Sequence, residues 1–168
     1  MKPLYQMFAH YNQWANGRVF EAVDALADAV YRSEEGAAFG SIHRTLNHLL
    51  AADRIWLNRL TGEGSAPTRL DAILCEDRAS LRKERAATDA VIIAYVGRLD
   101  EDAFERTFTY TPITNPKPVT QRLGPVLSHF FNHQTHHRGQ VHALLTRLAG
   151  KAPALDLIYY QRESGEGF

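Results

Sequence analysis

Histidines are concentrated in one short stretch near the C-terminus. The segment SHFFNHQTHHRGQVHALL contains five of the eight histidines of the chain: His129, His133, His136, His137 and His142. Imidazole nitrogens are common ligands of transition metals. On a helix, His133 and His137 stand four residues apart on one face, so both rings can reach the same ion. The spacing predicts a transition-metal site on a helix.

The apolar residues of the same stretch indicate which histidines face the protein interior. At about 100° per residue, His137 falls closest to the apolar direction and His133 next, whereas the other three fall to the sides. That direction is set by Val126, Leu127, Phe130, Phe131, Val141, Leu144, Leu145 and Leu148. Two inward imidazoles are costly without partners, and a metal satisfies a lone pair on each ring. Hydrogen-bonded core histidines without a metal are the simpler alternative.

A metal site that does chemistry needs a further ligand. Catalytic zinc commonly has three protein ligands and keeps a fourth position open for water or substrate. The third ligand is expected from another helix, and His10, His43 and His48 are the candidates by residue type. His48 lies at the boundary of an apolar stripe, so periodicity leaves the choice between His43 and His48 open.

The elements that carry these residues are predicted to be mostly helical. Apolar residues at steps of three or four indicate helices over about 4–29, 42–60, 73–99 and 125–148. Ser41 is a good N-cap for the second helix and Gly62 a good stop, while Gly150 follows the fourth. Residues 61–70 predict a surface linker. The apolar tail around residues 155–160 is expected to pack back on the bundle.

Between the third and fourth helices the pattern changes. From Phe104 to Leu123, apolar and polar residues alternate, and Asn115-Pro116 indicates a turn. This predicts a small β-hairpin in an otherwise all-α protein.

Composition limits the classes of function. A chain of 168 residues with 45% hydrophobic and 23% charged residues predicts a single globular domain over 1–168. Nineteen basic residues balance nineteen acidic ones, which argues against nucleic-acid or membrane-surface binding and favours a small-molecule substrate. One cysteine, no signal-peptide pattern and no long apolar run lead us to expect a cytoplasmic protein.

Three motifs together resemble a known family. They are YNQWAN near the N-terminus, NHLLAADRIWLNRL from Asn47 and NHQTHHRGQVHALL from Asn132. The chain is similar over essentially its whole length to the DinB/YfiT-like superfamily of metalloenzymes. The resemblance implies a four-helix bundle in up-down-down-up order, often a homodimer, with a metal held by His48, His133 and His137. It therefore selects His48, which periodicity did not.

The same resemblance implies a class of chemistry. Members of the superfamily include thiol-dependent enzymes in which a low-molecular-weight thiol is activated at the metal. We expect zinc or nickel here, with the bound ion activating a small thiol or water against a small electrophilic molecule. The alternative is a noncatalytic metal- or ligand-binding stress-response protein. Motifs of proteases, kinases, dehydrogenases and serine hydrolases are missing from the sequence.

Four further residues are candidates for supporting or substrate-binding roles. Arg138 and Gln140 flank His137, and His136 points away from the apolar face. Asp53 projects into the apolar stripe of the second helix and needs a partner such as Trp14, Arg18 or Arg138. We expect a structural anchor at Asp53 rather than a catalytic base.

Overall fold

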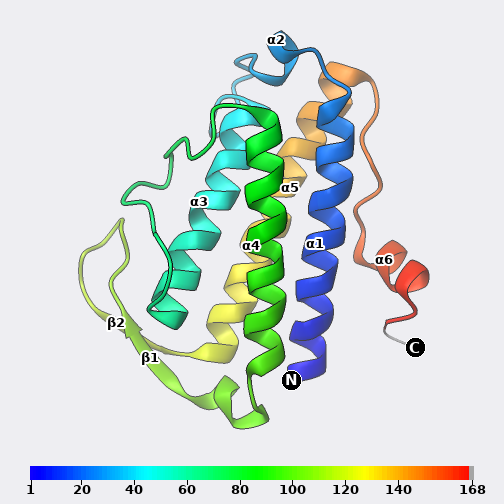
Figure 1. Ribbon diagram of the computed structural model, residues 1–168. Coiled ribbons are helices and arrows are strands. Elements are labelled where there is room, and N and C mark those ends of the chain that lie inside the picture. Colours follow the sequence, from blue (N-terminus) through cyan, green and yellow to red (C-terminus); the bar gives the residue numbers. More distant parts are fainter. Residues whose placement is uncertain (167–168) are drawn as a thin grey trace.

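Four long helices lie alongside one another in the computed structural model, which describes residues 1–166 (Figure 1). They are α1 (Lys2–Asp24), α3 (Ile42–Thr61), α4 (Arg78–Arg98) and α5 (Leu123–Ala149). Both α1 and α3 pack against α4 and also against α5. The mostly helical architecture predicted from periodicity is confirmed.

The path of the chain brings distant segments together. In Figure 1, α1 runs from the N-terminus to the end where the short helix α2 (Asp28–Tyr31) lies, and α3 runs back from that end. Residues 62–77 then return along the side of the molecule, so that α4 runs in the same direction as α3. After the hairpin, α5 runs in the direction of α1.

Local capping sets several helix ends where the sequence predicted them. The Ser41 hydroxyl accepts a hydrogen bond from the Arg44 amide at 3.2 Å, which caps the start of α3. Gly62 and Gly150 adopt left-handed conformations with φ of 72° directly after α3 and α5. These predicted boundaries are confirmed.

Two predicted helix ends were wrong, and side chains from elsewhere in the fold explain both. α1 ends at Asp24 instead of residue 29, because the Arg78 guanidinium donates hydrogen bonds to the carbonyl oxygens of Val23 and Leu26 at 2.6 and 3.0 Å. α4 starts at Arg78 instead of residue 73. The side-chain oxygen of Asn47 holds the amides of residues 74 and 75 in a non-helical turn, at 2.8 and 2.9 Å.

The predicted hairpin is confirmed. A 3-10 turn, η1 (Glu101–Glu105), leads into β1 (Thr107–Tyr110), which pairs antiparallel with β2 (Val119–Arg122). Thr107 is opposite Arg122 and Tyr110 is opposite Val119. The hairpin lies at the end of the bundle where α4 finishes and α5 begins (Figure 1).

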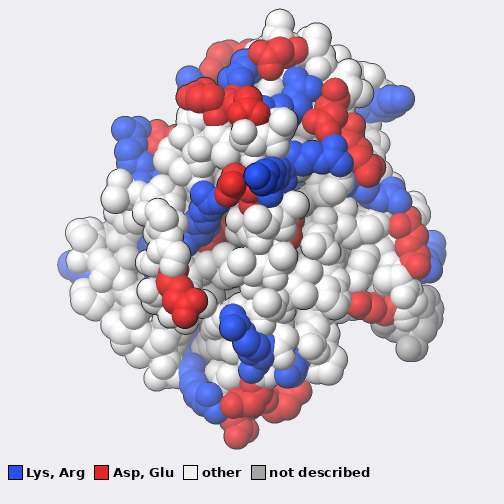
Figure 2. Space-filling view, in the orientation of Figure 1, with Lys and Arg blue, Asp and Glu red and all other residues white. Residues whose placement is uncertain are grey.

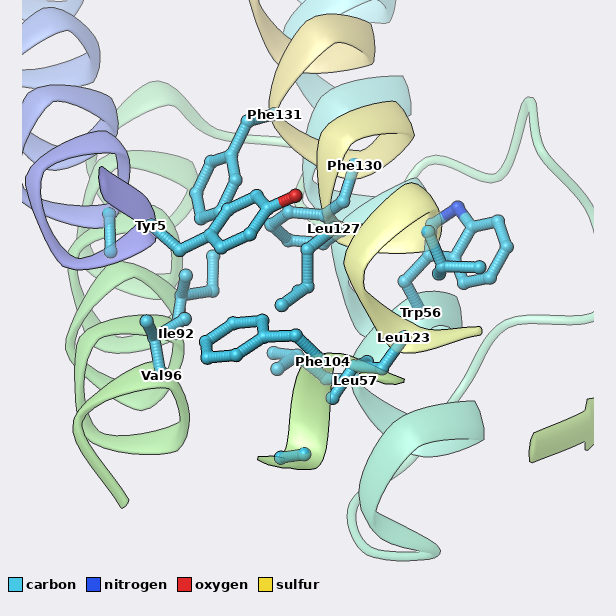
Figure 3. Close-up of a cluster of buried hydrophobic side chains, with 13 residues drawn as sticks. Tyr5, Trp56, Leu57, Ile92, Val96, Phe104, Leu123, Leu127, Phe130 and Phe131 are labelled. Carbon is cyan, nitrogen blue, oxygen red and sulfur yellow. The ribbon is translucent and has the colours of Figure 1, made fainter. Parts of the chain in front are cut away.

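The interior contains two large apolar clusters and a third, smaller one of Tyr11, Ala15 and Tyr160 between α1 and the C-terminal segment. Near the hairpin, Tyr5 stacks on Phe104 with ring centroids 5.2 Å apart, and Leu127 and Phe131 pack around them (Figure 3). A second cluster lies toward α2 and includes Val23, Tyr31, Leu50, Leu81, Val141 and Leu145. Along each of the four long helices, buried polar residues separate the residues of the first cluster from those of the second. They are Asn12, Asn16, Asp53, Arg85, Asp89, Gln134 and Arg138. We call this group the polar layer.

The C-terminal segment packs on α1, as the sequence predicted. Helix α6 (Leu157–Ser164) places Tyr160 edge-on against Tyr11 and Trp14, at centroid distances of 6.0 and 5.7 Å. On the outer surface, acidic and basic side chains are interspersed over the face shown in Figure 2. Among the described residues, no helix is long and apolar enough to cross a membrane.

Candidate metal centre

Three histidines from two helices converge on one point. The Nε2 atom of His48 on α3 lies 3.3 Å from Nε2 of His133 and 3.2 Å from Nε2 of His137, both on α5. Nitrogen ligands about 2.0–2.1 Å from a tetrahedral zinc ion lie about 3.3–3.4 Å from one another. The spacing of the three imidazoles therefore fits a shared divalent ion.

Hydrogen bonds on the opposite side of two rings fix the protonation of the facing nitrogens. His48 Nδ1 lies 2.7 Å from the carbonyl oxygen of Leu70, which only accepts, so Nδ1 carries the proton. His137 Nδ1 likewise lies 2.9 Å from Oε1 of Gln140. Neutral rings with a proton on Nδ1 present bare lone pairs at Nε2. Facing lone pairs repel unless a cation lies between them, so the donor set fits a bound metal.

Burial keeps these imidazoles in the metal-binding form. It lowers the pKa of His48 and of His137 below the ordinary histidine value. Burial, followed by the neighbouring His137 and His48, lowers the pKa of His133 to about 3. All three rings are therefore neutral at physiological pH, as metal binding requires.

Aromatic side chains enclose the three histidines. Phe39, from the loop before α3, stacks on His48 with ring centroids 3.8 Å apart and meets His137 edge-on at 5.4 Å. On another side, His129 lies 5.8 Å from the His133 ring and 5.5 Å from Trp56. His129 is exposed and does not join the group that could hold a metal.

The four residues predicted for supporting roles separate into two pairs. Gln140 contacts His137, and its side-chain nitrogen lies 3.2 Å from Nε2 of His136, which places both residues at the edge of the histidine group. Asp53 and Arg138 lie instead in the polar layer, where they contact other helices.

The partners predicted for Asp53 were wrong. Its carboxylate binds Arg85 of α4 at 2.7 Å and accepts a hydrogen bond from Gln134. Of the predicted partners, Trp14 and Arg18 both contact Glu163, and Arg138 donates to Asn12 and Asn16. Burial raises the pKa of Asp53 to about 6, against the opposing effect of Arg85. Arg85 also binds Asp89 at 2.9 Å, so one guanidinium joins two carboxylates.

The other candidates for the third ligand are elsewhere. The Nδ1 atom of His43 lies 3.2 Å from the Tyr31 hydroxyl within the second apolar cluster. His10 pairs with Glu166 at 2.8 Å near the C-terminus. Of the three candidates named from the sequence, His48 alone joins His133 and His137.

Several residues at this centre and in the polar layer were not predicted from the sequence. Leu70 acts through its backbone carbonyl and Phe39 lies in an irregular loop, so neither carries a periodic pattern. Arg85 and Asp89 do form a charged pair four residues apart on a helix, a pattern that sequence inspection can find.

The fold and the site together define a helical protein with a buried three-histidine group that could hold a divalent metal. The chain belongs to the DinB family, whose model matches residues 1–166. It is similar to the protein named Protein DinB of Bacillus subtilis (strain 168), with 28% identity over 152 residues. That match covers 86% of this chain and 85% of the relative.

Proposed function

We propose that this protein is a metal-dependent enzyme that activates a small thiol or water for attack on a small electrophilic molecule. The observation that carries the proposal is the convergence of three Nε2 lone pairs from His48, His133 and His137. Within residues 1–166, no fourth histidine, cysteine or carboxylate joins this group. A three-ligand group with a free position is typical of catalytic rather than structural sites.

The residues of the chain would hold a zinc or nickel ion and orient it. A divalent ion held by three neutral imidazoles keeps its full charge and lowers the pKa of a bound thiol or water. Leu70 and Gln140 fix the rings of His48 and His137 in the orientation that binding needs. Phe39 covers the face of His48 and excludes water from that side.

Other features of the proposal rest on the family and on the arrangement of the helices. We propose one domain whose long helices form an up-down-down-up bundle, which the helix directions in Figure 1 support. We also propose a homodimer that acts on a small molecule in the cytoplasm. The resemblance of the three sequence motifs to the superfamily supports the homodimer.

Elemental analysis of the purified protein tests the metal site. We expect about one equivalent of metal in the parent and loss of metal in His48→Ala and His133→Ala. His142→Ala is the matched control, because His142 is on the same helix as His133 but outside the histidine group. A metal-free parent protein, or full metal content in His48→Ala, would contradict the proposed site.

The chemical role is tested separately. Cobalt-loaded protein is titrated with 2-mercaptoethanol and followed by visible absorption, and thiol transfer and hydrolysis are then measured on a panel of electrophiles. A spectral change together with turnover that His133→Ala abolishes supports catalysis. Full metal content without a spectral change or turnover favours the alternative, a noncatalytic metal-binding protein.

A further inference from the structure

A cavity on the other side of α5 is separate from the three histidines. It has a volume of about 610 Å³ and lies between α1, α5 and the segment that leads into α6. None of His48, His133 and His137 lines it. The volume is within the roughly 300–1,000 Å³ of small-molecule pockets.

The wall of this cavity combines one buried cation with apolar surface. Phe8 from α1, Phe131 from α5, and Leu155 and Leu157 from the C-terminal segment supply apolar side chains. Arg138 also lines the cavity and is only 2% exposed. A cation so well removed from water normally has an anionic partner.

Arg138 has no such partner in the part of the chain that the structure describes. Its guanidinium donates to the neutral side-chain oxygens of Asn12, Asn16 and Thr135, and no carboxylate of residues 1–166 forms an ion pair with it. Its Nε–H group has no hydrogen-bond partner at all in that part of the chain. An orphaned buried donor beside a cavity points to a ligand or water that is not part of the chain.

The remaining charge at the cavity does not cancel that of Arg138. Asp156 also lines it, but this carboxylate is exposed to water, which screens its field. Asp53 and Asp89 share the guanidinium of Arg85 within the polar layer, and Asp89 is connected to Arg138 only through the side chains of Asn12 and Asn16. Arg138 is therefore the one buried charged side chain among the described residues that line the cavity, and most of the remaining lining surface is apolar.

We propose that this cavity is a second ligand site that binds a small amphipathic carboxylate. Its carboxylate lies against the Arg138 guanidinium, and its apolar body lies against Phe8, Phe131 and Leu157. The site is independent of any metal at the histidine group, because the two groups of residues face different neighbouring helices.

Isothermal titration with sodium octanoate, octanol and octylamine tests the charge preference. All three probes have the same apolar chain, so differences in their affinity are due to the headgroup. We expect octanoate to bind at least tenfold more tightly than either of the others, since a charge-assisted hydrogen bond to a buried group is worth about ten- to a hundredfold in affinity. Equal binding of octanol, tighter binding of octylamine, or no binding of octanoate would overturn the proposal.

A glycine in the cavity wall allows a blocking variant that keeps the fold. Gly139 lines the cavity, and an added Cβ there meets no atom within 4 Å, so Gly139→Leu introduces a large side chain at the cavity wall from a position with free space around its Cβ. Gly97→Leu on α4 is the matched control, because its Cβ also meets open space but lies outside the cavity. We expect loss of octanoate binding in Gly139→Leu and parent-like binding in Gly97→Leu. Unchanged binding in both variants would overturn the assignment.

Two further variants locate the carboxylate. Arg138→Met should weaken octanoate binding by about ten- to a hundredfold while leaving octanol binding unchanged. His48→Ala should bind octanoate as the parent does. Binding that disappears in His48→Ala but persists in Gly139→Leu would place the carboxylate at the histidine group and refute a second site.

Discussion

The ring nitrogens that face away from the candidate metal centre distinguish its three histidines. The Nδ1 atoms of His48 and His137 are held by Leu70 and Gln140, whereas no residue among 1–166 accepts a hydrogen bond from Nδ1 of His133. Groups that hold the far nitrogen of a ligating imidazole set its orientation and basicity. His133 is therefore the ring with the most freedom to turn when the site takes up a ligand.

Gln140→Ala tests the support of His137. Loss of the acceptor at His137 Nδ1 should weaken metal affinity by about ten- to a hundredfold without removing a ligand. Affinity is measured by competition with a chromogenic chelator. Gln13→Ala, which removes an exposed glutamine from α1, is the control. Equal affinity in parent and Gln140→Ala would show that this hydrogen bond does not hold the ring.

The pKa of His133 predicts how acid acts on the metal-free protein. In the folded protein this pKa is about 3, against about 6.5 for an unfolded histidine. Between these values the unfolded chain binds more protons, so the free energy of unfolding falls as the pH is lowered through that range. We expect the free energy of unfolding of His133→Gln to change less with pH than that of the parent. Urea titrations from pH 7 to pH 4, with chelator present, measure it.

Asp53 changes the free energy of unfolding with pH in the opposite direction to His133 over part of that range. Its pKa is raised to about 6, so its contribution to stability is present at low pH and is lost as the pH rises through 6. The test of His133 is therefore the difference between variant and parent curves. A difference that does not change with pH would contradict the low pKa of His133.

At the residue scale, sequence reasoning reached the three histidines that could hold a metal but not their surroundings. His133 and His137 follow from helical spacing, because both side chains belong to one regular element. His48 required family resemblance, since its apolar stripe did not show where α3 would meet α5. Leu70 and Phe39 lie in loops, where no periodicity relates a residue to its neighbours in space.

At the scale of the elements, helix ends that depend on neighbouring residues were predictable, and helix ends that depend on distant residues were not. Ser41, Gly62 and Gly150 end helices through their own backbone and side chains, so they were predictable. The end of α1 and the start of α4 depend on Arg78 and Asn47, which lie far away in the sequence.

Arg78→Ala tests the capping of α1 from another helix. Arg78 binds the carbonyls of Val23 and Leu26, and its guanidinium lies 4.4 Å from the Tyr31 ring centroid. We expect the free energy of unfolding to fall by about 2 kcal/mol, measured by urea denaturation. Arg82→Ala is the control on the same helix, since its ion pair with Asp24 is about half exposed and should contribute below about 1 kcal/mol. Equal effects of the two variants would contradict this role of Arg78.

For the whole molecule, a metal at the histidine group would join α3 to α5. A ligand that binds only the folded state stabilises it by RT ln(1 + [L]/Kd), about 2.7 kcal/mol at one hundred times Kd. We expect the Tm to rise on addition of zinc or nickel and to fall with EDTA, as measured by calorimetry. His48→Ala should show neither shift. A parent Tm that changes with neither metal nor chelator would indicate a histidine cluster that binds no metal.

The polar layer has a consequence for how the helices are aligned along their length. Asp53 of α3, Arg85 and Asp89 of α4, and Arg138 of α5 occupy one level between two apolar clusters. Displacing α4 by one turn, about 5.4 Å, would leave a buried charge without its partner, whereas apolar side chains would tolerate the shift far better. The buried charges thus act as an alignment key. They fix the level of α3 against α4, and the hydrogen bond from Gln134 of α5 to Asp53 sets the level at which α3 meets α5, and with it the height at which His48 faces His133 and His137.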